Sequence, residues 1–160
     1  GLNLEQNEAE KTFNLQLSSS PVRVTSHLWF LGEIPRINDF EAKSTTFVLE
    51  NGEEDFVSDD SALVAIKNNE LIIISGCAHS GICNICEYAK ELTGISKIKA
   101  VIGGFHLKDQ GEQTIKTIEY FKQNQIELPL PSHCTELLAK VLFQQQFNFP
   151  EVKTGLSFSF

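Results

Sequence analysis

The sequence of 160 residues has no methionine, no long apolar run and few basic residues. The missing methionine and the first residue, Gly1, predict a processed product, a tag-cleaved chain or a piece of a longer protein. No apolar stretch approaches the roughly 20 residues that span a bilayer, and residues 1–20 lack a signal-peptide core. With 13 basic and 21 acidic residues, the formal charge is −8. Nucleic acid and anionic membranes are therefore not expected as partners.

The four cysteines do not form the pattern of a disulfide framework, because a chain of this length builds its own hydrophobic core. Hydrophobic residues make up 41% of the chain and charged residues 21%, as in an ordinary globular protein. We expect a reducing, cytoplasmic location. The expected organisation is a polar tail or linker over residues 1–20, followed by one domain over residues 21–160.

Hydrophobic periodicity predicts an α/β fold. Strands are expected at 13–17, 27–31, 45–49, 62–66, 71–74, 98–102, 128–131 and 156–160. Helices are expected at about 82–93, 111–124 and 135–146, with Ser80 capping the first. Their predicted inward residues include Ile115, Ile118 and Phe121 in the second helix and Leu138, Val141 and Leu142 in the third. Strands and helices therefore alternate in the second half of the chain.

Three successive strands of this alternating series end in turns that carry histidine. The turns are Gly76-Cys77-Ala78-His79, Gly103-Gly104-Phe105-His106 and Ser132-His133-Cys134. The carboxyl ends of neighbouring parallel strands meet at one edge of a sheet, and thiol and imidazole groups bind zinc and related metals. The alternative is that each is a polar turn, a surface histidine or a helix-start histidine bonded to backbone. The spacing favours a shared metal or catalytic site.

Two further features have competing interpretations. Cys83 and Cys86 form a CxxC pattern, which suggests a redox pair or a metal knuckle, yet both fit the buried face of a helix. Packing is the better interpretation, because free cysteine is often fully buried. The loop with Glu33, Arg36, Asp39 and Glu41 is either a solvated loop or a substrate loop in which Arg36 faces a phosphate or carboxylate. Asp59-Asp60 is expected to serve as a cap or turn.

With these motifs in view, the chain resembles one branch of the metallo-β-lactamase superfamily, the dihydropterin-methyl-ribofuranosyl-aminobenzene phosphate synthase-like proteins, some of them called dihydropteroate-synthase-like. The resemblance rests on five blocks in the family's order. They are Gly32-Glu33-Ile34-Pro35-Arg36, Asp59-Asp60-Ser61-Ala62-Leu63-Val64, Gly76-Cys77-Ala78-His79-Ser80-Gly81-Ile82-Cys83-Asn84, Gly103-Gly104-Phe105-His106-Leu107 and Ser132-His133-Cys134-Thr135. The His-x-His-x-Asp-His loop of the superfamily's first half is absent.

The resemblance implies the C-terminal half of an αββα sandwich, with a mixed sheet, helices on its outer face and a metal site at one edge. In the complete site two metal ions, zinc or another divalent transition metal, hold an oxyanion or phosphate and activate a water. The implied metal ligands here are Cys77, His79, His106 and His133, and spacing leaves open which of Cys77 and His79 binds. The implied substrate contacts are Glu33, Arg36 and Asn84.

The function expected from the resemblance is a portion of a metal-dependent enzyme. That enzyme hydrolyses phosphate- or ester-type substrates or is a pterin-type transferase, and this chain is expected to be inactive without the missing half. The alternatives are a non-catalytic metal-binding or protein-interaction module and a CxxC redox protein. The expected partners are a small, phosphorylated or pterin-like substrate and, through an apolar sheet face left uncovered, a second copy or the polypeptide with the first half.

Overall fold

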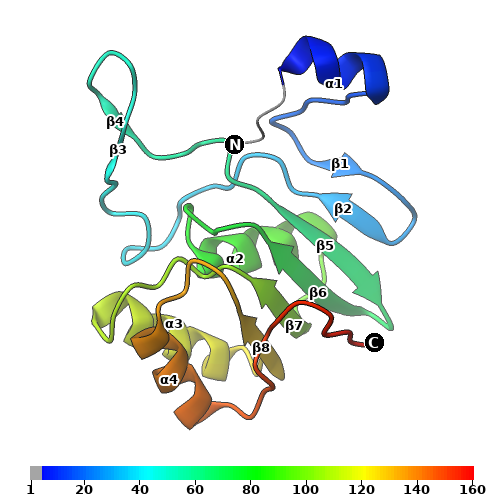
Figure 1. Ribbon diagram of the computed structural model, residues 1–160. Helices are drawn as coiled ribbons and strands as arrows, with labels where there is room; N and C mark the ends of the chain where they lie inside the picture. The colour runs from blue at the N-terminus through cyan, green and yellow to red at the C-terminus, as the bar shows by residue number, and fades with distance from the viewer. Residues whose placement is uncertain (1–4) are drawn as a thin grey trace.

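A six-stranded mixed sheet forms the centre of the computed structural model, which describes residues 5–160 (Figure 1). Its strand order is β1-β2-β5-β6-β7-β8, and β3 and β4 form a separate two-stranded hairpin. The strands are β1 (Val22–Arg23), β2 (Leu28–Phe30), β3 (Phe47–Val48), β4 (Glu54–Asp55), β5 (Ala62–Lys67), β6 (Glu70–Ser75), β7 (Ile98–Gly103) and β8 (Leu128–Pro131). The helices are α1 (Gln6–Thr12), α2 (Ile82–Thr93), α3 (Glu112–Gln123) and α4 (Leu137–Gln146).

The strand pairing changes from antiparallel to parallel at β6. Strands β5 and β6 form an antiparallel hairpin through Asn68 and Asn69, whose positive φ angles of 52° and 61° suit a tight two-residue turn. From β6 onward the pairs are parallel, and α2 and α3 make the crossovers to β7 and β8. The carboxyl ends of β6, β7 and β8 therefore meet at the same edge.

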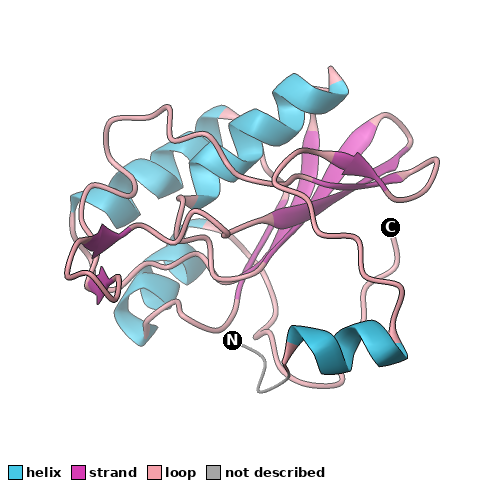
Figure 2. Cartoon of the chain, turned by 90° about the horizontal axis from the view of Figure 1, so that it is seen from above, coloured by secondary structure: helices cyan, strands magenta, loops and turns pink. Residues whose placement is uncertain are grey.

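Helices α2, α3 and α4 share one hydrophobic core with the sheet, and Figure 2 shows helices stacked along one side of the strands. Side chains alternate along each strand, so Val64 and Ile73 face this core, whereas Ile74 is 40% exposed. Phe143 of α4 contacts Phe105 and Phe121, with ring centroids 5.6 Å apart in each pair. This cluster holds α4 beside α3 and beneath the turn that follows β7.

The C-terminal segment turns back after α4. Phe149 belongs to the core cluster, and Phe158 packs against it. Lys67, at the end of β5, donates a hydrogen bond to the backbone carbonyl of Phe160. Within the described chain, none of the helices combines the length and the apolar character that a membrane crossing requires.

The structure confirms the predicted fold class and most of the predicted elements, but two predicted strands, some predicted buried positions and one predicted helix cap were wrong. Residues 13–17 and 156–160 do not pair as strands in the described chain, because alternation alone supplies no ladder partner. Part of the expected polar tail forms α1, and residues 1–4 lie outside the described region.

The predicted inward faces of two helices also need correction. In α4, Leu138 and Val141 are exposed, whereas Ala139 and Phe143 are fully buried because Phe143 joins the aromatic cluster. In α3, Ile118 and Phe121 are buried as predicted, but Ile115 is 48% exposed. Ser80 does not cap α2 with its hydroxyl, since the helix begins after Gly81 and the Glu41 carboxylate accepts its first free N–H groups.

Candidate metal centre

The turns that follow β6, β7 and β8 lie side by side at one edge of the sheet. Two backbone hydrogen bonds extend the parallel ladder beyond the strands, from Gly104 N to Gly76 O at 2.9 Å and from Ser132 N to Gly103 O at 2.8 Å. This register places the three histidine-bearing turns in contact, as the alternating pattern predicted. The sequence prediction of a common edge is therefore confirmed.

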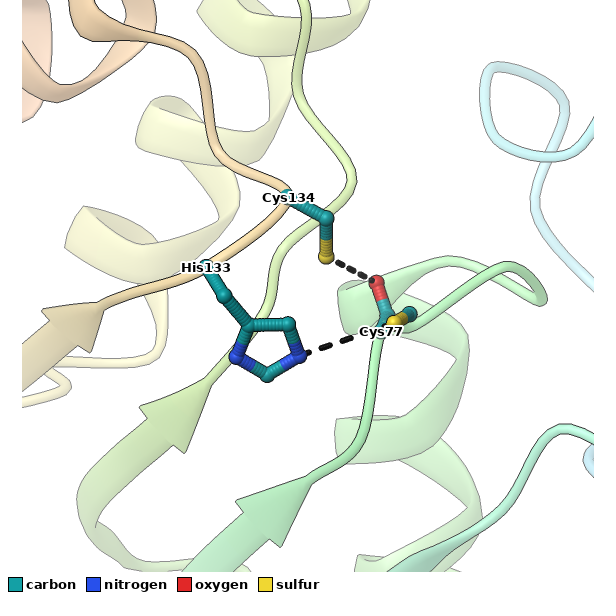
Figure 3. Close-up of side chains that lie close together, drawn as sticks. All are labelled: Cys77, His133 and Cys134. Carbon is teal, nitrogen blue, oxygen red and sulfur yellow. Dashed lines mark hydrogen bonds between the residues drawn. The ribbon is translucent and has the colours of Figure 1, made fainter. Parts of the chain in front are cut away.

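Cys77, His133 and Cys134 form the group with metal-ligand geometry in the described chain (Figure 3). One donor atom from each lies within 4.8 Å of the other two, and Cys77 Sγ is 3.5 Å from His133 Nε2. The Cys134 thiol donates a hydrogen bond to the Cys77 carbonyl at 3.3 Å. Ser132 Oγ lies 3.2 Å from His133 Nδ1, which orients the ring so that Nε2 faces the thiols. A hydrogen bond to the ring nitrogen that does not bind the metal commonly fixes the orientation of a metal-binding imidazole.

This donor set fits a zinc-like ion. Two sulfur ligands and one imidazole match the three-ligand zinc sites that leave a fourth position open. Burial, with the neighbouring Cys77 thiol, raises the pKa of Cys134 to about 11. The thiol is therefore protonated near neutral pH, and an ion must displace the proton in order to bind, which makes affinity depend on pH.

Gly104 leaves the space in which the cluster forms. A Cβ atom at this position would collide with Cys134 Sγ and lie 2.7 Å from Gly76 O and 3.0 Å from Cys77 Cα. Gly104 therefore marks a close approach between the backbones of neighbouring turns. A side chain here would push the β6 and β8 turns apart.

His79 and His106 form a second, adjoining set. Their ring centroids lie 4.4 Å apart with a tilt of 48°, and the edge of Phe47 packs on His79 at 5.3 Å. The Nδ1 atom of His106 is buried and has no hydrogen-bond partner among the described residues. Burial, with a smaller contribution from His79, lowers the pKa of His106. Its ring is therefore neutral near pH 7 and can accept a proton or an ion.

The backbone around both sets is strained. Ala78, His106 and Cys134 have positive φ angles of 58°, 49° and 45°, a region that side chains rarely occupy. All three lie in the turns at the carboxyl ends of the strands. Such strain gathers at functional sites because it aims side chains that relaxed turns would point elsewhere.

The two imidazoles form the floor of a cavity of about 300 Å³. Its walls come from the loop 40–47, residues 56 and 57, the β7 turn and the start of α3. The lining includes the cations Lys43 and Lys108, the carboxylates of Asp109 and Glu112, the hydroxyls of Ser44, Thr45, Thr46 and Thr114, and the rings of Phe40, Phe47 and Phe56. A small molecule with an apolar or aromatic body and charged or polar groups fits this lining.

The three predicted substrate contacts lie outside this cavity lining. Glu33 is exposed and lines a separate hollow of about 460 Å³ with Asp59. Arg36 donates from Nη2 to the Phe56 carbonyl at 2.5 Å and so supports the cavity wall from behind. Asn84 is fully buried, and its Oδ1 accepts the N–H groups of Ile37 and Asn38.

Sequence reasoning missed three side chains that build the site. Cys134 completes the ligand group, and its position next to His133 was the available signal. Glu41 reaches from the loop to α2, and Asp60 accepts the N–H of Ser80 at 3.0 Å in the turn that carries His79. No local pattern reveals these last two contacts, since each joins segments far apart in the chain.

The chain resembles two curated proteins of Methanocaldococcus jannaschii. It is 38% identical over 140 residues to 7,8-dihydropterin-6-methyl-4-(beta-D-ribofuranosyl)-aminobenzene-5'-phosphate synthase, covering 82% of this chain and 47% of that protein. It is 33% identical over 141 residues to an uncharacterised protein, covering 87% of this chain and 52% of that protein. The chain thus spans about half the length of the curated relatives it matches.

Among solved structures, the chain is similar to one described as a metal-dependent hydrolase of the β-lactamase superfamily. The TM-score is 0.77 at 28% identity, covering 95% of this chain and 61% of the other. No family model matches the chain. The fold, the edge position of the thiol and imidazole turns, and both kinds of relative nevertheless agree. These findings support the assignment of the chain to the metallo-β-lactamase superfamily, with similarity to the dihydropterin-methyl-ribofuranosyl-aminobenzene phosphate synthase-like branch over about half the length of those relatives.

Proposed function

We propose that this chain supplies a divalent-metal site and a substrate cavity to a metal-dependent enzyme that acts on small, phosphate- or ester-type molecules. The observation that carries the proposal is the convergence of Cys77, His133 and Cys134 within 4.8 Å, beside a cavity floored by two imidazoles. Support comes from the description of the structural neighbour as a metal-dependent hydrolase. A pterin-type transferase is the second candidate, favoured by the printed name of the 38% identical relative.

In this proposal different side chains of the chain bind the metal, accept a proton and contact the substrate. Cys77, His133 and Cys134 hold zinc or a similar ion, which when bound supplies Lewis-acid polarisation at this edge. Neutral His106 accepts a proton at one ring nitrogen, and His79 beside it orients that ring. Lys43 and Lys108 pair with an anionic group of the substrate, in a cavity whose lining also carries the carboxylates of Asp109 and Glu112.

Metal binding is tested first. Zinc titrated against the metal-free chain in competition with a chromophoric chelator is expected to bind at one tight site. We expect Cys77→Ser and His133→Ala to weaken this site at least about tenfold, on the scale of a lost ligand or outer partner. His79→Ala, in the adjoining imidazole pair, is the matched control and should change the affinity far less. Equal losses in all three variants would contradict the assignment of ligands.

Activity is tested second, with the bis- and mono-p-nitrophenyl phosphate esters. We expect little turnover by this chain alone, because the His-x-His-x-Asp-His ligands are not in it. Turnover should appear when a polypeptide carrying that motif is added, and Cys77→Ser should abolish it. Tight zinc binding with no activity under any of these conditions would instead favour a non-catalytic metal-binding module.

A further inference from the structure

A closed set of hydrogen bonds joins residues 37–41, at the start of the loop that lines the cavity (the cavity loop, residues 40–47), to the start of α2. Glu41 is only 2% exposed, and its two oxygens accept the N–H groups of Cys83 and Asn84, each at 2.9 Å. Asn84 reaches back, with Oδ1 accepting the N–H groups of Ile37 and Asn38. Asn38 closes the set by donating from Nδ2 to Glu41 Oε2 at 2.6 Å.

Glu41 occupies a place that no neighbouring side chain of α2 can fill. The residue before α2 is Gly81, which has φ +98° and whose missing Cβ would overlap the Glu41 carboxylate. No ion pair in the described chain involves Glu41, so the helix N-terminus and the N–H groups are what stabilise the charge. A buried carboxylate without a cation is costly, which calls for a reason beyond local capping.

The clasp formed by Glu41, Asn84 and Asn38 ends on both sides at the site. On one side the chain runs directly into the cavity wall, which includes Phe40 and Lys43. On the other, Asn84 Nδ2 donates to Ser80 O at 2.8 Å, one residue after His79. The clasp therefore sets the distance between the cavity wall and the turn that carries Cys77 and His79.

We propose that Glu41 is a positioning residue that fixes the Cys77–His79 turn against the cavity loop. The role that this gives to Cys77 and His79 rests on the proposed function, but the positioning itself does not. Replacing the carboxylate by an amide, as in Glu41→Gln, turns an NH₂ group toward one of the two backbone N–H donors. The clasp then opens, and the turn with Cys77 and His79 loses its fixed position.

The test uses the imidazole resonances of the metal-free 160-residue chain, read by long-range ¹H–¹⁵N correlation. Only four histidines are present, so each is assignable by substitution. Glu41→Gln should shift the His79 and His106 resonances and leave His27, which lies at the other end of β5, unchanged. The amide N–H groups of Cys83 and Asn84 should exchange about tenfold faster or more, as expected for local opening.

A matched control separates positioning from stability. Ile98→Val trims the core at the far end of β7 and should lower the midpoint of unfolding without moving the His79 and His106 resonances. Asn38→Ala, which removes one bond of the clasp and keeps the carboxylate, should move the same resonances in the same direction by less. If Glu41→Gln does not fold, this variant alone decides.

Zinc titration then separates this inference from the proposed function. If Glu41→Gln shifts the His79 and His106 resonances but the wild-type chain binds no zinc, the role of Glu41 is supported and the metal site is overturned. Tight zinc binding by wild type, with Glu41→Gln and Asn38→Ala both leaving the His79 and His106 resonances in place, would overturn the role of Glu41. If both ideas hold, Glu41→Gln should weaken zinc binding about tenfold.

Discussion

His79 and His106 face each other across two different turns, with ring centroids 4.4 Å apart. Neither ring belongs to the donor group of Cys77, His133 and Cys134, although all five side chains lie on one edge of the sheet. The edge therefore presents two adjoining positions, one rich in sulfur and one made of imidazoles. Metals with a preference for thiolate are expected at the first and substrate chemistry at the second.

Gly104→Ala should disrupt the sulfur-rich position. The new Cβ would meet Cys134 Sγ and the backbone of the β6 turn, so we expect a loss of about 1–3 kcal/mol in the free energy of unfolding. Zinc affinity should fall as well, and both are measured by denaturant unfolding and chelator competition. The control is Gly76→Ala in the neighbouring turn, whose Cβ meets only Ser61 O at 3.8 Å. Equal effects at both glycines would contradict this account of the close approach.

The four cysteines should separate into two classes of reactivity. All four are free, but Cys83 and Cys86 are buried, and burial raises the pKa of both thiols well above the ordinary value. A disulfide reagent should therefore modify the part-exposed Cys77 first and Cys134 more slowly in the native chain, because burial raises the pKa of Cys134 to about 11, and zinc should slow both reactions. Under denaturant all four should react. Rapid modification of Cys83 or Cys86 in the native chain would show that the buried face of α2 is accessible to the reagent.

The pH dependence of stability should reveal the Glu41 carboxylate. Burial raises the pKa of Glu41 above 4.5, and the N–H donors of Cys83 and Asn84 offset only part of this. The folded state therefore binds more protons than the unfolded state between pH 4.5 and the raised value. The stability from protonated Glu41 is present below that window and is lost as pH rises through the folded-state pKa.

Glu41→Gln removes this titration and supplies the reference. The free energy of unfolding of wild type, minus that of Glu41→Gln, should fall as pH rises through the window. Urea unfolding at constant ionic strength over a pH series measures this difference. A difference that stays flat, or that grows with pH, would mean that the carboxylate is charged in the fold without cost.

The sheet face away from the helices should mediate association. Ile74 is 40% exposed there and pairs with Leu63 and Ile102 across the ladder. We expect the isolated chain to self-associate through this face, or to bind a polypeptide carrying the first half of the family fold. Light scattering should show smaller species for Ile74→Lys, whereas Ile115→Lys, at a similarly exposed position on α3, should change nothing. A stable wild-type monomer with two tightly bound ions per chain would contradict this expectation.

Much of the second half of the fold was predictable from the sequence, because its signals are local. Apolar runs closed by glycine predicted β6 and β7, and a 3.6-residue period predicted α2 with Cys83 and Cys86 inside. The alternation of strand and helix then predicted the shared edge of the three turns. For these elements local propensity and tertiary packing agree.

The rest depended on contacts between distant segments. Leu138 of α4 looked like a core residue, yet Phe143 sets the inward face because its ring fills the space beside Phe105 and Phe121. Glu41 looked like part of a solvated acidic loop, and its real partner is a helix N-terminus far along the chain. Such choices are made by the packed structure, and a window of neighbouring residues does not contain them.

The position of β7 between β6 and β8 has a consequence for the order in which this protein matures. Cys77 and His133 are 56 positions apart and meet only after two crossovers have closed. Closing so long a loop has an entropic cost that only the finished sheet repays. In a growing chain, Cys77 is therefore without its partners His133 and Cys134 until β8 has docked. Capture of a zinc ion at this edge would report that the last parallel strand is in place.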